Sequence, residues 1–453
     1  MNQARGSEEI TEPNFDTLPN NPDNATPETD RQRFNFSSPL LVIFVTVLID
    51  LIGFGIVIPV LPYYAEAQAF QATPFEIGLL TSSYSAMQFI FSPILGQLSD
   101  RYGRRPILFF SLLGTSLGFL IVGVANTLVL LFVGRILDGM TGGNISTAQA
   151  YIADVTTPEN RAKGMGMIGA AFGLGFVFGP VIGGLLSKVE FHNQYFNIEG
   201  IQTPFLFAAL LALGNATLLY FVLPETVKFD KTAAPKPIRS RFSLFKEGFA
   251  NRNLAIVIVL YFLVVTAFSM MTTAFILYTM YRFGYDAVQN GFLFMYIGIL
   301  GAVFQGVLFG RLAKRFGESR LVLAGALIMG VAFVFVPIVS PTVGGLTGLL
   351  IGIAAFAIGN SLATPSLTSL GSKFSPPDSQ GTSLGVLQSS ASLARAGGPA
   401  LAGLLLYSAT AASALKLDDA SLYRTFWTAA GIMFSAVLLA VYFVRKTSQL
   451  SLS

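Results

Sequence analysis

Long apolar runs alternate with short polar segments along most of the chain after residue 38. We predict twelve apolar spans, at residues 39–62, 78–98, 106–126, 128–152, 164–187, 202–223, 253–281, 289–310, 320–340, 343–369, 383–408 and 422–444. A helix of about 20 apolar residues can cross the ~30 Å hydrocarbon core of a bilayer. Because lipid offers no hydrogen-bond partners to a bare backbone, such spans must be helical. The pattern predicts an all-α membrane protein with twelve transmembrane helices.

The composition supports this class. Hydrophobic residues make up 53% of the 453 positions, charged residues 11%, and the mean hydropathy is +0.64. A soluble domain carries roughly 25% charged residues, so this chain has too few to cover a water-facing surface. Cysteine is absent and His192 is the one histidine. We therefore expect no metal site and no cofactor, and an enzyme is disfavoured because no nucleophile–base pair is visible.

The basic residues indicate how the spans are oriented. Most of the 28 Lys and Arg residues fall in segments that share one side if the N-terminus is cytoplasmic. The opposite loops hold only Lys188, Arg282, Lys416 and Arg424. Short cytoplasmic loops are enriched in Lys and Arg, so both termini are expected in the cytoplasm. The net charge of +4 then needs no nucleic-acid partner.

The two halves of the chain resemble each other. Gly179-Pro180 recurs as Gly398-Pro399, and Gly96-Gln-Leu98 returns as Gly310-Arg-Leu312. Parallel repeats of this kind occur in transporters built from two similar bundles. We predict two pseudo-symmetric six-helix bundles, because a polar, basic linker divides the spans equally. The expected parts are a disordered cytoplasmic tail (1–37), the N-terminal bundle (38–223), a cytoplasmic linker (224–252), the C-terminal bundle (253–445) and a C-terminal tail (446–453).

Three charged side chains inside predicted spans stand out. Asp50 is central in the first span, and Arg135 and Asp138 share one face of the fourth. Each costs at least about 2.5–3.5 kcal/mol at mid-membrane. Arg135 and Asp138 can simply neutralise each other. Asp50 has no cation within a helical turn, so its partner must come from another helix or from water, and we assign all three to a proton-coupling site.

Polar residues on other span faces are candidates to line a substrate cavity. Span 4 continues as a polar stripe through Gly142 and Ser146, and Tyr84 lies one turn from Gln88 in span 2. Interhelical hydrogen bonding is the competing explanation for such residues. The candidates are Tyr84, Gln88, Asn144, Gln149, Gln305, Asn360, Gln388 and Arg395.

Two further segments carry distinctive patterns. In span 5, small residues at 175, 179 and 183 form a ridge that permits close backbone contact with another helix, and Pro180 removes one helical hydrogen bond. The segment after span 2 places Asp100 among three arginines and two glycines, which predicts a cytoplasmic latch between the halves. The residues of these segments are Gly175, Gly179, Pro180, Gly183 and Gly184, and Gly96, Asp100, Arg101, Gly103, Arg104 and Arg105.

These motifs resemble the major facilitator superfamily, in particular its twelve-span drug:proton antiporter branch. The 96–105 segment resembles the superfamily's loop 2–3 motif, Arg135 with Gly139 resembles the span 4 motif, and 175–184 fits the span 5 antiporter motif. The second copy of the loop motif has Lys314 where an acid is expected.

Within that branch the N-terminal half is most similar to tetracycline exporters. The resemblance implies efflux driven by inward proton flow, with Asp50 and Arg135 at the coupling site and Asp100 and Arg104 in the gate. Where those exporters carry a span 3 acid, a span 8 histidine and a span 9 aspartate, this chain has Gly118, Gly301 and Met329. Tetracycline itself therefore does not follow as the substrate.

The expected function is proton-coupled export of small amphipathic molecules by a monomeric carrier in a bacterial-type inner membrane. The partners are the substrate, protons and the lipid bilayer. A symporter that imports a metabolite is the first alternative, although the resemblance of the span 5 ridge to an antiporter motif argues against it. A non-transporting membrane receptor is the second.

Overall fold

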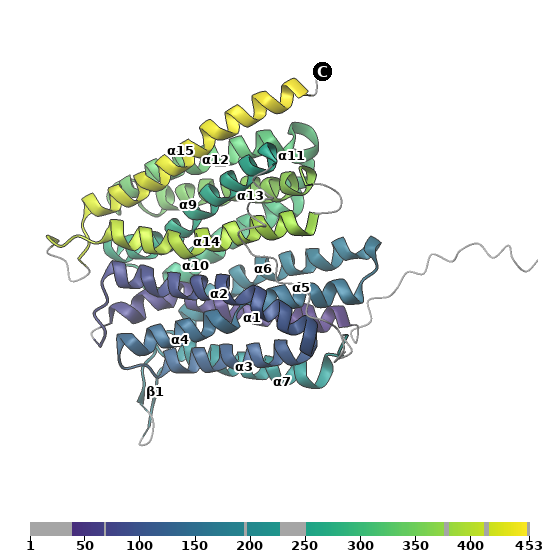
Figure 1. Ribbon diagram of the computed structural model, residues 1–453. Helices are drawn as coiled ribbons and strands as arrows, with labels where there is room; N and C mark the ends of the chain where they lie inside the picture. The colour runs from purple at the N-terminus through teal and green to yellow at the C-terminus, as the bar shows by residue number, and fades with distance from the viewer. Residues whose placement is uncertain are drawn as a thin grey trace, which may run out of the picture. The chain divides into compact units, whose positions relative to one another are not determined.

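Helices dominate the part of the chain that the structure, a computed structural model, describes (Figure 1). The described residues are 39–67, 69–193, 197–226, 251–375, 380–411 and 416–450. The predicted N-terminal tail and most of the predicted linker lie outside them. Two short strands, β1 (Phe191–His192) and β2 (Asn197–Ile198), pair antiparallel, so His192 lies in a small exposed hairpin between helices.

Every predicted span overlaps a helical segment. The segments are α1 (Pro39–Glu66), α2 (Pro74–Tyr102), α3 (Arg104–Gly123), α4 (Leu128–Thr141), α5 (Asn144–Val155), α6 (Pro158–Leu186), α7 (Thr203–Val222), α9 (Arg252–Phe283), α10 (Ala287–Val303), the π-helix η2 (Phe304–Leu308), α11 (Phe309–Phe316), α12 (Glu318–Phe335), the 3₁₀ turn η3 (Val336–Ile338), α13 (Gly345–Lys373), α14 (Gln380–Leu406) and α15 (Asp419–Leu450). In the described residues, ten helical segments are long and apolar enough to cross a membrane. The less apolar helices α2 and α14 are not among those ten.

The outward-facing side chains suit a lipid environment. Phe221 is 78% exposed, Leu438 74% and Val129 69%, and many other large apolar side chains are similarly uncovered. A soluble protein rarely leaves so much contiguous apolar surface in water. The buried core is also apolar, and it extends across most of the helices. Apolar side chains both inside and outside are expected of a multi-pass membrane protein.

The two glycine–proline helices each pack one face on the helix that begins their own repeat. A Cβ atom built on Gly179 of α6 would lie 2.6 Å from the Cα of Gly55 in α1. One built on Gly398 of α14 would lie 2.7 Å from the Cβ of Ser269 in α9. Small residues let helix backbones approach this closely within a membrane. The span 5 ridge thus lies against α1, and its span 11 counterpart lies against α9.

The same two helices pack a second face across to the other half of the chain. A Cβ atom on Gly184 of α6 would lie 2.6 Å from the carbonyl oxygen of Ala287, which begins α10. A Cβ atom on Gly403 of α14 would lie 2.4 Å from the carbonyl oxygen of Pro74, which begins α2. Figure 1 shows α14 beside α2 and α10 beside α6. The less apolar helices α2 and α14 therefore cover each other.

Three boundaries differ from the predicted ones. The predicted span 128–152 is two helices, because the chain breaks the α-helix at Gly142 and Gly143. The predicted 96–105 loop is mostly helix: α2 continues to Tyr102, and only Gly103, with φ of +101°, separates it from α3. That left-handed conformation favours glycine, which explains the single-residue turn. At the C-terminus, α15 runs to Leu450, past the predicted tail boundary.

Candidate functional site

Asp50 lies in the middle of α1 with its side chain turned toward α5. The side chain is half-buried and forms a hydrogen bond with Asn144, the first residue of α5. Asp138 is close enough to repel it electrostatically. Among the described residues, no Lys or Arg nitrogen lies within 4.0 Å of the Asp50 carboxylate. The structure therefore joins two predicted site residues, Asp50 and Asn144, in one polar contact without a compensating cation.

Arg135 and Asp138 form a buried ion pair one turn apart on α4. The Arg135 Nη1 atom lies 2.6 Å from the Asp138 Oδ2 atom, and each residue is only 3% exposed. Thr115 of α3 adds a side-chain hydrogen bond to Asp138. The Arg135 guanidinium also stacks 4.5 Å above the ring of Tyr84. Pairing and ring contact together offset the cost of burying the arginine.

Gly139 in α4 lets Tyr84 lie close to this pair. A Cβ atom on Gly139 would lie 2.4 Å from the Tyr84 carbonyl oxygen, so α2 and α4 touch through their backbones. Gln88 donates from Nε2 to the carbonyl oxygen of Gly142 at 2.9 Å and to the Tyr84 hydroxyl at 3.1 Å. The ring of Phe54 in α1 lies 5.4 Å from the Tyr84 ring. Tyr84 is thus fixed where α1, α2 and α4 meet.

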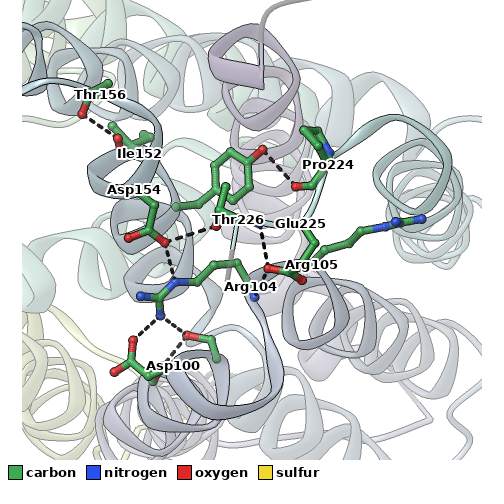
Figure 2. A network of polar contacts seen from close by, with 12 residues as sticks. Asp100, Arg104, Arg105, Ile152, Asp154, Thr156, Pro224, Glu225 and Thr226 are labelled. Atoms are coloured by element: carbon green, nitrogen blue, oxygen red, sulfur yellow. Dashed lines mark hydrogen bonds and ion pairs between the residues drawn. The ribbon is translucent and has the colours of Figure 1, made fainter. Parts of the chain in front are cut away.

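A second polar network surrounds Arg104 at the turn between α2 and α3 (Figure 2). Arg104 Nη1 lies 2.5 Å from Asp100 Oδ1 and donates to Ser99 Oγ at 2.7 Å. Its Nε atom lies 3.0 Å from Asp154 Oδ2, near the end of α5. Arg104 is 7% exposed, so its buried guanidinium is held between α2 and α5 by charge-assisted bonds to more exposed carboxylates.

Glu225 extends this network to the segment after α7. Its carboxylate accepts the backbone N–H groups of Arg104 at 2.9 Å and of Arg105 at 3.1 Å (Figure 2). These groups begin α3, where a carboxylate is favoured by unpaired N–H donors and the helix dipole. A Cβ atom on Gly103 would collide with Glu225, at 2.5 Å from its Oε2 atom. The glycine of the motif therefore makes room for this carboxylate.

The remaining residues of the predicted latch make contacts nearby. The Arg105 guanidinium bonds the Tyr220 carbonyl oxygen and lies 4.9 Å from that ring, and Arg101 lies over the adjacent Tyr102 ring. Gly96 faces Ser146 of α5 at an ordinary contact distance. The polar contacts described for Arg104 and Arg105 all stay within residues 99–226. A latch between the two halves remains a prediction.

Several polar contacts do join the halves, near the end of α1 and the start of α10. Asn290 of α10 is fully buried and donates from Nδ2 to the Tyr63 hydroxyl of α1 at 2.6 Å. Tyr63 in turn donates to the carbonyl oxygen of Tyr285 at 2.6 Å. Lys188, just after α6, forms an exposed ion pair of 2.9 Å with Asp286, the N-cap of α10. We call this end the Asn290 end and the other the Arg104 end.

The candidates from the second half are more dispersed. Arg395 of α14 is half-buried and interacts electrostatically with Tyr84 and with Tyr261 of α9. Asn360 accepts a hydrogen bond from Thr364 one turn later, at 2.9 Å. Gln305 and Gln388 are exposed, and Gln305 lies in the π-helix; Gln149 of α5, in the first half, is exposed as well. Of these second-half candidates, only Arg395 lies near Tyr84. We call Tyr84 and its contacts Phe54, Gln88 and Arg135 the Tyr84 cluster.

Asp154 and Glu225 are polar partners that the sequence analysis missed. Each lies more than 45 residues from Arg104 along the chain, and neither falls inside a predicted apolar core. Their positions could have pointed to this role, because each is an acid next to the cytoplasmic end of a predicted span. In the described residues, no three His, Asp or Glu side chains converge as metal ligands would. The site consists of charged side chains and their hydrogen-bond partners.

The fold and these intramembrane charges define a membrane carrier. A model of the Major Facilitator Superfamily matches residues 43–399 and 306–452, so the chain belongs to this family of transporters, which carry small molecules and are not enzymes. It is 32% identical to the class B tetracycline resistance protein of Escherichia coli over 78% of this chain and 84% of that protein.

Solved transporter structures share the fold. The chain matches the human organic anion transporter MFSD10 with 25% identity and a TM-score of 0.61, over 88% of this chain and 98% of that one. It matches a bacterial homologue of the human lysosomal transporter Spinster with 16% identity and a TM-score of 0.73, over 91% and 98%. The second likeness is one of fold alone.

Proposed function

We propose that this protein is a proton-coupled antiporter that exports small amphipathic molecules. The observation that carries the proposal is Asp50: an acid at mid-membrane, bonded to Asn144, with no described cation within 4.0 Å. An ionisable group in a transmembrane helix is expensive and usually marks an ion or proton path. Asp50 is the proton carrier, and the Arg135–Asp138 pair beside it changes the local charge as helices move.

Alternating access between two six-helix bundles provides the movement. The bundles are residues 38–223 and 253–445, with α2 and α14 completing the twelve spans. The glycine–proline helices support this symmetry, because α6 packs on α1 and α10 while α14 packs on α9 and α2. Close contacts at the Asn290 end support a state that is closed there, and we assign the opening of this state to the Arg104 end.

The orientation follows from the positive-inside rule. The basic Arg104 end faces the cytoplasm, both termini are cytoplasmic, and the Asn290 end faces outward across a bacterial-type inner membrane. A cytoplasmic substrate then enters the open end and leaves after the Asn290 end opens. The protein acts as a monomer, because each half supplies the partner surface that the other needs.

Similarity to tetracycline resistance proteins supports a drug-like substrate, and the structure argues for one other than tetracycline itself. At Gly118, where those exporters carry an acid, a Cβ atom would lie 2.9 Å from the Cβ of Asp138 and 2.9 Å from the Gly134 carbonyl oxygen. Helices α3 and α4 thus approach too closely for an acidic side chain. The polar site here is built around Tyr84 instead.

Proton-coupled export is testable in energised inside-out membrane vesicles loaded with a pH-sensitive dye. Substrates from a drug panel should discharge the proton gradient in wild-type vesicles, and an uncoupler should abolish substrate uptake. Asp50→Asn should remove both effects, whereas Asp50→Glu should keep part of them. Glu190→Gln, an exposed acid outside the spans, is the matched control and should behave as wild type.

Full substrate-induced proton release in Asp50→Asn vesicles would refute the assigned role. The symporter alternative predicts the opposite direction, with substrate accumulating in intact cells that overproduce the protein. The receptor alternative predicts ligand binding without flux and unchanged binding after Asp50→Asn.

A further inference from the structure

Arg395 is the one charged residue in the sequence of α14. It lies near the middle of that helix, one turn before Gly398, which packs against α9. Its side chain is half-buried, so it is neither sealed in the core nor fully open. At this depth a long side chain cannot easily reach the membrane–water interface, as arginines near helix ends do.

Arg395 lacks an acidic partner among the described residues. Its one described hydrogen bond runs from Nη2 to the Ser392 hydroxyl at 3.1 Å, and no carboxylate lies within 4.0 Å. The titratable groups that act on it are the phenols of Tyr261 and Tyr84. Arg135, the other intramembrane arginine near Tyr84, is neutralised by Asp138. The contrast leaves one uncompensated positive charge beside the Tyr84 cluster.

The acids in the described part of the chain do not supply the missing charge. The described acids of the second half lie at helix ends, at Asp286, Glu318, Asp418 and Asp419. Asp50 interacts with Asp138 and Asn144 rather than with Arg395. A buried or half-buried guanidinium without an anion is costly, and a planar guanidinium binds carboxylate-like groups with two parallel hydrogen bonds. A bound anion would supply the missing charge.

We propose that Arg395 binds the anionic group of the transported molecule, which makes the substrate an amphipathic organic anion. The carboxylate, sulfonate or phenolate meets the guanidinium between α14, α2 and α9. The half-buried ring of Phe54, which lies 5.4 Å from that of Tyr84, offers an aromatic surface to the apolar part. This inference rests on the proposed transport function, but it concerns binding, which needs no proton gradient.

Two xanthene dyes of opposite charge test the proposal: anionic fluorescein and cationic rhodamine 123. Binding to the purified full chain in phosphatidylcholine nanodiscs is measured by fluorescence anisotropy. Wild-type protein should bind fluorescein more tightly than rhodamine 123. Arg395→Gln should weaken fluorescein binding about 10- to 100-fold, the effect of losing a charge-assisted hydrogen bond. Rhodamine 123 binding should stay equal or improve, and Arg395→Lys should be intermediate.

Arg252→Gln is the matched control, because Arg252 is exposed at the start of α9 and bonds Tyr442. It should leave both affinities unchanged. Retained rhodamine 123 binding shows that the Arg395→Gln protein is folded. The proposal fails if wild type binds neither dye or prefers rhodamine 123, or if Arg395→Gln binds fluorescein as wild type does.

A lipid headgroup is the other possible source of the anion. If phosphatidylglycerol in the nanodisc displaces fluorescein from wild type but has no effect on Arg395→Gln, Arg395 binds lipid and the substrate proposal is overturned. If fluorescein binds as expected while no dye or drug discharges a proton gradient, the binding inference stands and the antiport function falls. If Asp50→Asn protein still prefers fluorescein to rhodamine 123, anion binding at Arg395 is independent of proton coupling at Asp50.

Discussion

Gly78 of α2 and Gly403 of α14 meet with no room for a side chain on either. A Cβ atom on Gly78 would lie 2.4 Å from the Pro399 carbonyl oxygen and 3.1 Å from the Cα of Gly403. Helices α2 and α14 therefore touch through their backbones at the Asn290 end. Because backbone cannot give way as a flexible side chain can, this contact forms in one arrangement only.

Gly403→Ala should act as a wedge at this contact. Overpacking of this kind costs about 1–3 kcal/mol, and here the cost falls on the state closed at the Asn290 end. Transport should drop, and the Asn290 end should open more often. The natural chain has no cysteine, so labelling of a single Ala287→Cys residue, 4% exposed, can report opening.

The labelling rate of that cysteine should rise in Gly403→Ala and stay at the wild-type level in Gly214→Ala. Gly214 of α7 is the control because a Cβ atom there meets nothing within 4 Å. Equal labelling in the two variants would contradict the wedge.

The Arg135–Asp138 pair should be stabilising only as a pair. Asp138→Leu leaves Arg135 buried without its anion, and such breaks cost about 3–5 kcal/mol. Thermal unfolding of the detergent-purified protein should show a large loss of stability. The double variant Arg135→Leu, Asp138→Leu should recover most of that loss yet remain inactive in transport. A double variant as unstable as the single one would show that the charges are not the cause.

Asp154→Asn should impair the protein more than Asp100→Asn. Both acids bond Arg104, but the Asp154 side chain is 31% exposed and that of Asp100 is 62% exposed. Bonds to charged groups are worth about 1.5–3 kcal/mol when they are buried and less when solvent screens them. Turnover in vesicles and thermal stability should therefore fall further for Asp154→Asn, with membrane insertion of both variants normal.

The Lys188–Asp286 ion pair should not set the pH dependence of transport. Partial burial alone would raise the pKa of Asp286, but the hydrogen bonds from Lys188 and the first turn of α10 hold it below its ordinary value. A depressed carboxyl pKa means that the contribution is complete above the ordinary pKa of about 3.9 and is lost only at more acidic pH.

Asp286→Asn should therefore change the transport rate modestly, because the pair is exposed, and leave the shape of the pH profile unaltered between about pH 5 and 8. Asparagine also keeps the helix cap, which isolates the charge effect. A profile that shifts in this variant would assign pH sensing to the outer ion pair.

Sequence patterns located the helices because membrane spans obey a strong rule: the backbone must bond itself and the side chains must be apolar. The same rule exposed Asp50, Arg135 and Asp138, which violate it. Spacing also placed Arg135 beside Asp138, since residues three apart share a helix face. The contact between Arg135 and the Tyr84 ring joins two helices, and no local pattern encodes its geometry.

The missed features depend on distant or permissive residues. Asp154 and Glu225 reach Arg104 only after three helices have packed together. The break at Gly142 and Gly143 was hidden because glycine is compatible with both a helix and its interruption.

The π-helical turn Phe304–Leu308 fixes the angular relation between the two ends of one long helix. Gly298 before the turn touches α6, whereas Arg311 and Lys314 follow it. Each residue of an α-helix advances about 100° around the axis, so deleting one residue from the turn would swing those basic groups by about that angle. Gly298 would stay in place. A single-codon deletion can therefore re-aim the charges at one membrane surface without disturbing the packing at the other.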